Sequence, residues 1–227
     1  MLALDSVETG SGGDILKLNL SDGSALIAGA AYLPPAFSGA FLRAGAPIGP
    51  EAEAALRLAA ESLAAERAAL RLIARCEQCR RRLEQKLRRR GHGPEAVRSA
   101  LDRLSALDLL NDRRYGELWL RGRLDRESRG PRPLRIFLAA RGLGREDAEA
   151  ALEAALTPEA EAALLERCVK KAGPRAVRNR PGSGPRPGGA RFGSGGPAAA
   201  LRHFLKGQGF SGAAIEHYME QRVDGDG

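Results

Sequence analysis

The chain has 227 residues, a formal net charge of +8 and only 4% aromatic residues. This length allows one body with a sizeable core or two small domains, and the Ala-, Leu- and Arg-rich composition favours helices over a β-sandwich or barrel. Between Arg71 and Arg145 there are 21 Lys and Arg against 9 Asp and Glu, which indicates a polyanionic partner, with nucleic acid as the first candidate. A solvated, arginine-rich helical face without a binding role is the alternative that charge alone leaves open.

The N-terminal part predicts strands rather than helices. Residues 1–13 are polar and glycine-rich, and we expect a disordered tail there. Residues 14–50 hold an alternating segment from Leu16 to Leu20, followed by a turn around Asp22-Gly23, which is typical of a β-hairpin. Because a lone hairpin is marginally stable in water, we expect it to dock on the helices that follow.

One pattern recurs three times in the rest of the chain: two leucines four residues apart, and a glycine four residues after the second. The copies are Leu83-Leu87-Gly91, Leu134-Leu138-Gly142 and Leu201-Leu205-Gly209. An apolar pair follows each glycine, namely Val97-Leu101, Ala148-Leu152 and Ile215-Met219. Glycine suits the left-handed position after a helix end, so each copy predicts a helix, a Leu-x-x-x-Leu helix closed by glycine, and a third helix. Such units are too small to bury their own faces and therefore stack.

The predicted fold is all-α, with three tandem three-helix repeats in an elongated, curved array after the N-terminal hairpin. The first repeat, with its leading helix, covers residues 51–110, the second 111–157 and the third 158–222, and residues 223–227 form a tail. The second and third copies are 67 residues apart, against 51 for the first two. A Gly-, Pro- and Arg-rich insertion at 173–197 accounts for the surplus, and we expect a flexible loop there.

Basic residues recur on the outward face of the Leu-x-x-x-Leu helices when the leucines are placed inward on a helical wheel. Arg81 is in register with Arg132, and Arg135 with Arg202. A stripe of this kind would contact backbone phosphates without reading sequence, or would meet an acidic protein surface. The nine candidate contact residues, called the basic stripe below, are Arg81, Arg82, Lys86, Arg88, Arg89, Arg132, Arg135, Arg202 and Lys206.

Other motifs give weaker signals. Cys76-Glu-Gln-Cys79 lacks the second Cys-x-x-Cys of a zinc site and the βαβ setting of a redox dithiol, which favours two small residues at a helix–helix turn. Tyr115, Leu118 and Trp119 share one helical face, and we expect them in the core rather than in a base-stacking platform. Neither a phosphate-binding glycine loop nor a nucleophile elbow occurs, so we expect no enzyme, no cofactor and no metal.

The N-terminus shows no signal-peptide pattern, and charges interrupt the alanine-rich stretch at 52–74, so that it cannot span a bilayer. Three cysteines, an odd number, predict reduced thiols. We therefore expect a cytoplasmic monomer with no membrane partner.

The segment that links the first two repeats carries a distinctive series. It contains Leu110-Asn111-Asp112-Arg113-Arg114-Tyr115, then Trp119, Arg123 and Gly130-Pro131-Arg132-x-Leu134-x-x-x-Leu138-x-x-x-Gly142-Leu143. This series, together with the basic repeats and the hairpin, resembles the RecX family of recombination regulators. In the first repeat, Cys79-x-x-Arg82-Leu83-x-x-Lys86-Leu87 is similar to the family's Ser-x-x-Glu-Leu-x-x-Lys-Leu. Cys79 and Arg82 replace the Ser and Glu of a helix-capping box, a device worth about 0.5–2 kcal/mol.

The resemblance implies a non-enzymatic protein of recombination and DNA repair that lies in the helical groove of the RecA–DNA filament. It would limit filament extension, ATP hydrolysis and strand exchange. The implied partners are the RecA filament and single- or double-stranded DNA, the latter through phosphate contacts. The alternative is a general nucleic-acid-binding helical repeat protein without a RecA role, and both functions predict salt-dependent DNA binding.

Overall fold

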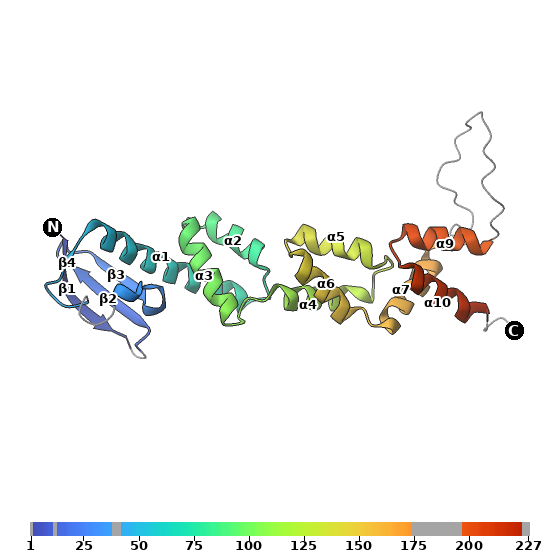
Figure 1. Cartoon of the computed structure of the whole chain (residues 1–227), viewed down its shortest axis with the longest axis horizontal. Coiled ribbons are helices and arrows are strands. Elements are labelled where there is room, and N and C mark those ends of the chain that lie inside the picture. Colours follow the sequence, from blue (N-terminus) through green and yellow to red (C-terminus); the bar gives the residue numbers. More distant parts are fainter. Residues whose placement is uncertain (1, 11–12, 38–41, 174–196, 224–227) are drawn as a thin grey trace, which may run out of the picture. The chain divides into compact units, whose positions relative to one another are not determined.

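The structure is a computed structural model that describes residues 2–10, 13–37, 42–173 and 197–223. The chain divides into two units, residues 1–111 and 112–227. Helices make up most of the described chain, and the strands precede them in the first unit (Figure 1). The mostly helical fold class that the sequence predicts is confirmed. The insertion at 173–197 and the tail at 223–227 lie outside the described residues, except for Gly173, Pro197 and Val223.

The first unit begins with a four-stranded antiparallel sheet in the order β3-β2-β1-β4. Its strands are β1 (Leu2–Thr9), β2 (Ile15–Leu20), β3 (Ala25–Gly29) and β4 (Pro47–Ile48). The predicted hairpin is confirmed as β2 and β3, with Leu18 opposite Leu26. In its turn, Gly23 has a φ of 81°, and the Asp22 carboxylate accepts the Ser24 backbone N–H at 2.9 Å.

The expectation of a disordered tail at residues 1–13 is wrong for Leu2–Thr9, which form β1. Leu4 is buried in this strand and pairs with Leu20 of β2. The polar composition that suggested disorder has a simple cause: Asp5 and Glu8 are exposed, because a strand with one buried face keeps polar side chains on the other.

Helix α1 (Pro50–Ile73) covers the sheet with its first half. The core beneath it includes Leu4, Leu18, Leu20, Ala28, Leu56 and Ala59. Tyr32, which follows β3, donates a hydrogen bond from Oη to Glu66 Oε2 at 2.8 Å, and Glu66 also pairs with Arg103 at 3.5 Å. Burial and the Glu66 carboxylate together raise the pKa of Tyr32 above its usual range. The predicted docking of the hairpin on the helices is therefore observed.

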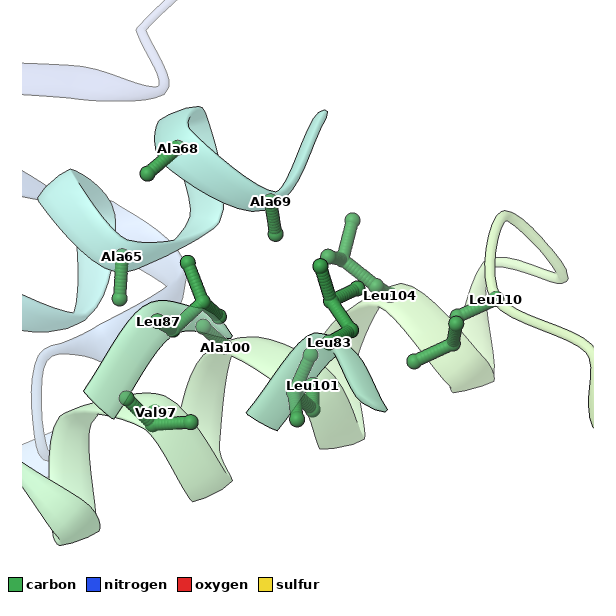
Figure 2. Packing of buried hydrophobic residues seen from close by; sticks show 10 residues of the cluster. All are labelled: Ala65, Ala68, Ala69, Leu83, Leu87, Val97, Ala100, Leu101, Leu104 and Leu110. Carbon is green, nitrogen blue, oxygen red and sulfur yellow. The ribbon is translucent and has the colours of Figure 1, made fainter. Parts of the chain in front are cut away.

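The second half of α1 forms the first three-helix repeat with α2 (Arg80–Arg89) and α3 (Pro94–Ala106). Leu83 and Leu87 of α2 are fully buried and point at alanines of α1 and at Val97 and Leu101 of α3 (Figure 2). Gly91 follows α2 with a φ of 89°, and the next N–H, of His92, bonds to the Leu87 carbonyl at 3.3 Å. This left-handed helix end is the role predicted for glycine.

The second unit holds the other two repeats. The second repeat consists of α4 (Asp112–Leu124), α5 (Pro131–Arg141) and α6 (Arg145–Ala155), and the third of α7 (Pro158–Ala172), α9 (Pro197–Gly207) and α10 (Gly212–Val223). The leucine pairs of α5 and α9 are buried, and the glycines that follow, Gly142 and Gly209, have φ values of 103° and 89°. All three predicted repeats are thus present in the described chain.

The segment between α4 and α5 of the second repeat forms hydrogen bonds with the third repeat. The Gly130 N–H donates to the Gln208 carbonyl at 3.0 Å, and Arg167 of α7 donates to the carbonyls of Leu124 at 2.8 Å and Glu127 at 3.1 Å. A Cβ on Gly130 would lie 2.6 Å from the Gly209 backbone, so glycine is required for this close approach. The third repeat therefore holds the α4–α5 segment at both ends.

Truncating a buried leucine should separate core packing from surface effects. We expect Leu87→Ala to lower the free energy of unfolding by about 2–5 kcal/mol, because it leaves a cavity among α1, α2 and α3. Leu107→Ala is the matched control, since Leu107 is 51% exposed and its loss should cost under about 0.5 kcal/mol. Urea unfolding followed by circular dichroism measures both, and similar losses for the two variants would contradict this assignment of the core.

Candidate functional site

All nine residues of the basic stripe are exposed. They lie on the three Leu-x-x-x-Leu helices: Arg81, Arg82, Lys86, Arg88 and Arg89 on α2, Arg132 and Arg135 on α5, and Arg202 and Lys206 on α9. Their direction follows from the buried leucines on the same helices, because residues one or two positions from an inward side chain lie about 100° or 200° around the helix from it. The structure divides these residues into two groups by their neighbours.

Two stripe arginines form ion pairs with the third helix of their repeat. Arg202 donates through Nε and Nη2 to the two carboxylate oxygens of Glu216, both at 2.9 Å, and this guanidinium lowers the pKa of Glu216. Arg135 lies 3.9 Å from Glu149, which is the equivalent position of the second repeat. These two arginines therefore link neighbouring helices, a role that the sequence analysis missed.

The first repeat has the opposite signs at the same register. Glu84 stands where Arg135 stands in the second repeat, and Arg98 stands where Glu149 stands. On α2, Glu84 pairs with Arg88 at 3.5 Å, and Lys86 donates to Gln78 Oε1 at 2.6 Å. Four of the nine stripe residues thus already have an acidic or amide partner.

The other five stripe residues belong to none of the ion pairs in the part of the chain that the structure describes. They are Arg81, Arg82, Arg89, Arg132 and Lys206. Three of them lie on α2, and the repeat-equivalent pair of Arg81 and Arg132 is among them. Because no carboxylate of the described residues engages them, these five residues make the better candidates for contact with an anionic partner.

A second basic feature was missed by the sequence analysis. Three arginines stack on two aromatic rings of α4 and α5. The Cζ atoms of Arg141 and Arg123 lie 4.2 Å and 5.3 Å from the centroid of the Trp119 ring. The Cζ atom of Arg129 lies 4.9 Å from the centroid of the Phe137 ring. We call these five residues the arginine–aromatic ladder. Such contacts fix guanidinium groups at small entropic cost.

The ladder corrects the expectation that Tyr115, Leu118 and Trp119 belong to the core. Leu118 is 49% exposed, and Tyr115 and Trp119 are half-buried. The residues of α4 that face the core are Gly116, Leu120 and Leu124 instead. The spacing of Trp119 and Arg123, four residues apart on a helix, is the signal in the sequence from which this pairing was available.

Glu127 forms ion pairs with two arginines of the ladder. It is only 6% exposed, and its carboxylate oxygens lie 3.5 Å from Arg123 Nε and 3.4 Å from Arg129 Nε. The Ser128 N–H also donates to it at 3.0 Å. A buried carboxylate requires this compensation, and its two guanidinium partners are held on their Nε edges.

The cysteines carry free thiols. Cys76 is exposed and Cys79 is fully buried at the start of α2. Burial raises the pKa of the Cys168 thiol to about 11. Among the described residues, no group of three or more His, Cys, Asp and Glu side chains is placed to hold a metal ion. Within the same residues, no helix combines the length and apolarity that a membrane crossing requires.

Glu127→Gln tests the support of the ladder. We expect it to destabilise the protein by roughly 1–3 kcal/mol, because an amide cannot compensate two guanidinium charges and leaves buried polar atoms without partners. Glu153→Gln, on the exposed surface of α6, is the matched control and should leave stability unchanged. Urea unfolding monitored by tryptophan fluorescence compares the two, and equal stabilities would show that the Glu127 contacts contribute nothing.

Thiol reactivity should differ sharply among the cysteines. At about pH 8 we expect a disulfide reagent to modify Cys76 rapidly, whereas burial keeps Cys79 and Cys168 inaccessible until the protein unfolds. The reagent releases a coloured thiolate for each cysteine that it modifies, so absorbance with and without denaturant counts the accessible cysteines. Rapid native-state reaction that persists in Cys76→Ser would contradict this assignment.

Comparison with known proteins gives these features a family. A model described as the first three-helix domain of RecX matches residues 65–104, and one described as the second three-helix domain matches residues 111–152. The regulatory protein RecX of Halorhodospira halophila is 39% identical over 159 residues, which cover 67% of this chain and 84% of the relative. That of Chromohalobacter salexigens is 32% identical over 151 residues, covering 66% of this chain and 88% of the relative.

Two solved structures share the fold. A crystal structure of a regulatory protein RecX superposes with a TM-score of 0.63 at 20% identity, over 97% of this chain and 100% of that one. The RecX of Lactobacillus salivarius gives a TM-score of 0.54 at 20% identity, over 71% and 96% of the two chains. From its repeats, its basic helices and these relatives, we conclude that the chain belongs to the RecX family of regulatory proteins.

Proposed function

We propose that this protein binds the RecA–DNA filament in its groove and lowers RecA filament extension, ATP hydrolysis and strand exchange. Membership of the RecX family supports a regulatory role. The proposed activity is one of binding alone, and no residue of the chain has to perform a chemical step.

The observation that carries the proposal is the group of unpaired stripe residues. Arg81, Arg82 and Arg89 follow one another on the exposed side of α2, and Arg132 repeats the position of Arg81 on α5. Arginines with no acidic neighbour retain their full attraction for an external anion, whereas Arg202 loses most of it to Glu216 at 2.9 Å. Cations of this kind attract a polymer that carries closely spaced negative charges.

The paired stripe residues have a different part in this proposal. Glutamates already engage Arg135 and Arg202, and we expect replacement of these two arginines to weaken binding less than replacement of Arg81 or Arg132. The contact surface of the proposal is therefore smaller than the nine residues of the stripe.

The decisive measurement is the ssDNA-dependent ATPase of RecA with substoichiometric amounts of this protein. We expect the wild type to lower the rate and the triple variant Arg81→Ala, Arg82→Ala, Arg89→Ala to lose most of this effect. Its DNA binding should also show a salt dependence that is shallower by about 2 in the log–log slope, because up to three phosphate contacts are lost.

The matched control removes the same charge elsewhere. Arg57, Arg98 and Arg145 are arginines of other helices that are each paired with a glutamate, and their triple alanine variant should inhibit RecA as the wild type does. Equal loss in both triple variants would point to net charge rather than to the stripe. An unchanged RecA ATPase with wild-type protein would overturn the RecA proposal and leave a general nucleic-acid-binding function.

A further inference from the structure

A hollow opens beside the arginine–aromatic ladder, on the last turns of α4. Its volume is about 420 Å³, and its lining consists of Leu118, Trp119, Gly122, Arg123, Arg126 and Glu127. Its apolar lining is the half-buried Trp119 and Leu118, which is 49% exposed. Its charged lining is Arg123 and Arg126, together with Glu127, whose carboxylate is paired with Arg123 and Arg129. Apolar and cationic side chains side by side suit a ligand that has a flat apolar part and a negative charge.

Gly122 is the unexplained residue of this hollow. Its φ is not in the left-handed region, and a Cβ built on it would meet nothing within 4 Å. Neither backbone conformation nor internal packing therefore requires glycine there, although glycine weakens a helix relative to alanine. Gly116 of the same helix is different, because its Cβ would lie 2.7 Å from that of Ala151. The open space above Gly122 is consistent with the close approach of a ligand.

Arginines recur along the sequence of this segment, and the first two of them line the hollow. Arginines occur at every third position from 123 to 135: Arg123, Arg126, Arg129, Arg132 and Arg135. Arg126 and Arg132 are exposed and belong to none of the ion pairs of the described residues. Arg123 and Arg129 meet Glu127 through Nε, and these contacts leave their orientation fixed by a carboxylate and an aromatic ring. Of these five, only Arg123 and Arg126 line the hollow, and Arg126 is the one of the two that is in no ion pair of the described residues.

We propose that this hollow takes an unpaired base of single-stranded nucleic acid, with an adjoining phosphate on Arg126. The base packs against Leu118, over Gly122, and against the Arg123 guanidinium that the Trp119 ring supports. Bases stack on aromatic rings and on guanidinium planes with little preference for sequence. A duplex keeps its bases stacked inside, so its contact with this site is limited to phosphates. The inference rests on the direct DNA contact in the proposed function, and it names the form of DNA.

Trp119 is the only tryptophan of the chain, so its fluorescence reports on this hollow. The probes are an oligothymidylate of about 15 nucleotides, an abasic oligonucleotide of the same length and charge, and a duplex. We expect quenching by oligothymidylate only, whereas the abasic strand and the duplex bind through phosphates without quenching. Equal quenching by the abasic strand would overturn base insertion.

Variants of Gly122 give a test that loss of folding cannot imitate. Gly122→Ala should raise the melting temperature, because alanine favours the helix, and should weaken oligothymidylate binding several-fold. Gly122→Leu places a large side chain in the hollow and should weaken oligothymidylate binding about 10-fold, which corresponds to the loss of one stacked base. The affinity for the abasic strand should stay unchanged. Gly212→Ala, at another exposed glycine with open space around it, is the control that should leave both affinities as they are.

The outcomes separate the two proposals. If the wild type binds both single strands and Gly122→Leu binds them equally well, base insertion fails while phosphate contact stands. If the wild type binds no oligonucleotide, the direct DNA contact of the proposed function fails with it, whatever the RecA ATPase shows. Quenching by an acidic peptide with an aromatic side chain, without quenching by oligothymidylate, would assign the hollow to a protein partner and overturn the inference.

Discussion

The packing of two leucines, four residues apart, against the other helices of the same repeat is the contact on which the rest of this structure depends. On α2, Leu83 and Leu87 are fully buried, and the equivalent leucines of α5 and α9 are buried in the same way. Because one turn of helix separates the two leucines, they fix the rotation of the helix about its axis. The directions of all other side chains on that helix follow, including the outward direction of the basic stripe.

Electrostatic neighbours then decide which outward charges are available to a partner. Glu216 engages Arg202 and Glu149 lies near Arg135, whereas Arg81 and Arg132 belong to no such pair within the described residues. An exposed ion pair contributes little to stability, but it removes much of the attraction that its arginine has for an external anion. The proposed contact surface is therefore set by the distribution of glutamates as much as by that of arginines.

The second unit adds a site that no single repeat builds. Glu127 orients Arg123 and Arg129 with its side chain, and its backbone carbonyl accepts a hydrogen bond from Arg167 of the third repeat. Since Gln208 also binds Gly130, the segment that carries the ladder is held by the repeat that follows it. Stacking of repeats thus does more than bury apolar area, because it holds the segment that carries Glu127, one of the residues that line the hollow.

Much of the fold was available from the sequence, because its signals are local. A leucine pair and a glycine such as Gly91 lie within a few turns of one helix. The helix end depends on a single residue that can adopt a positive φ, which glycine does most readily. The strand β1 was missed because the partner that buries Leu4 is Leu20, on another strand, and its own residues look polar. Nothing within residues 1–13 states that pairing.

For the candidate site, the sequence determined that arginines recur at outward positions and that the chain resembles RecX proteins. Only the tertiary structure decided which of those arginines already have partners, and that Trp119 supports two guanidinium groups instead of filling the core. The physical reason is the range of the interactions. Helix direction depends on neighbours three or four residues away, whereas the pairing of Arg202 with Glu216, and of Arg141 with Trp119, depends on how separate helices pack.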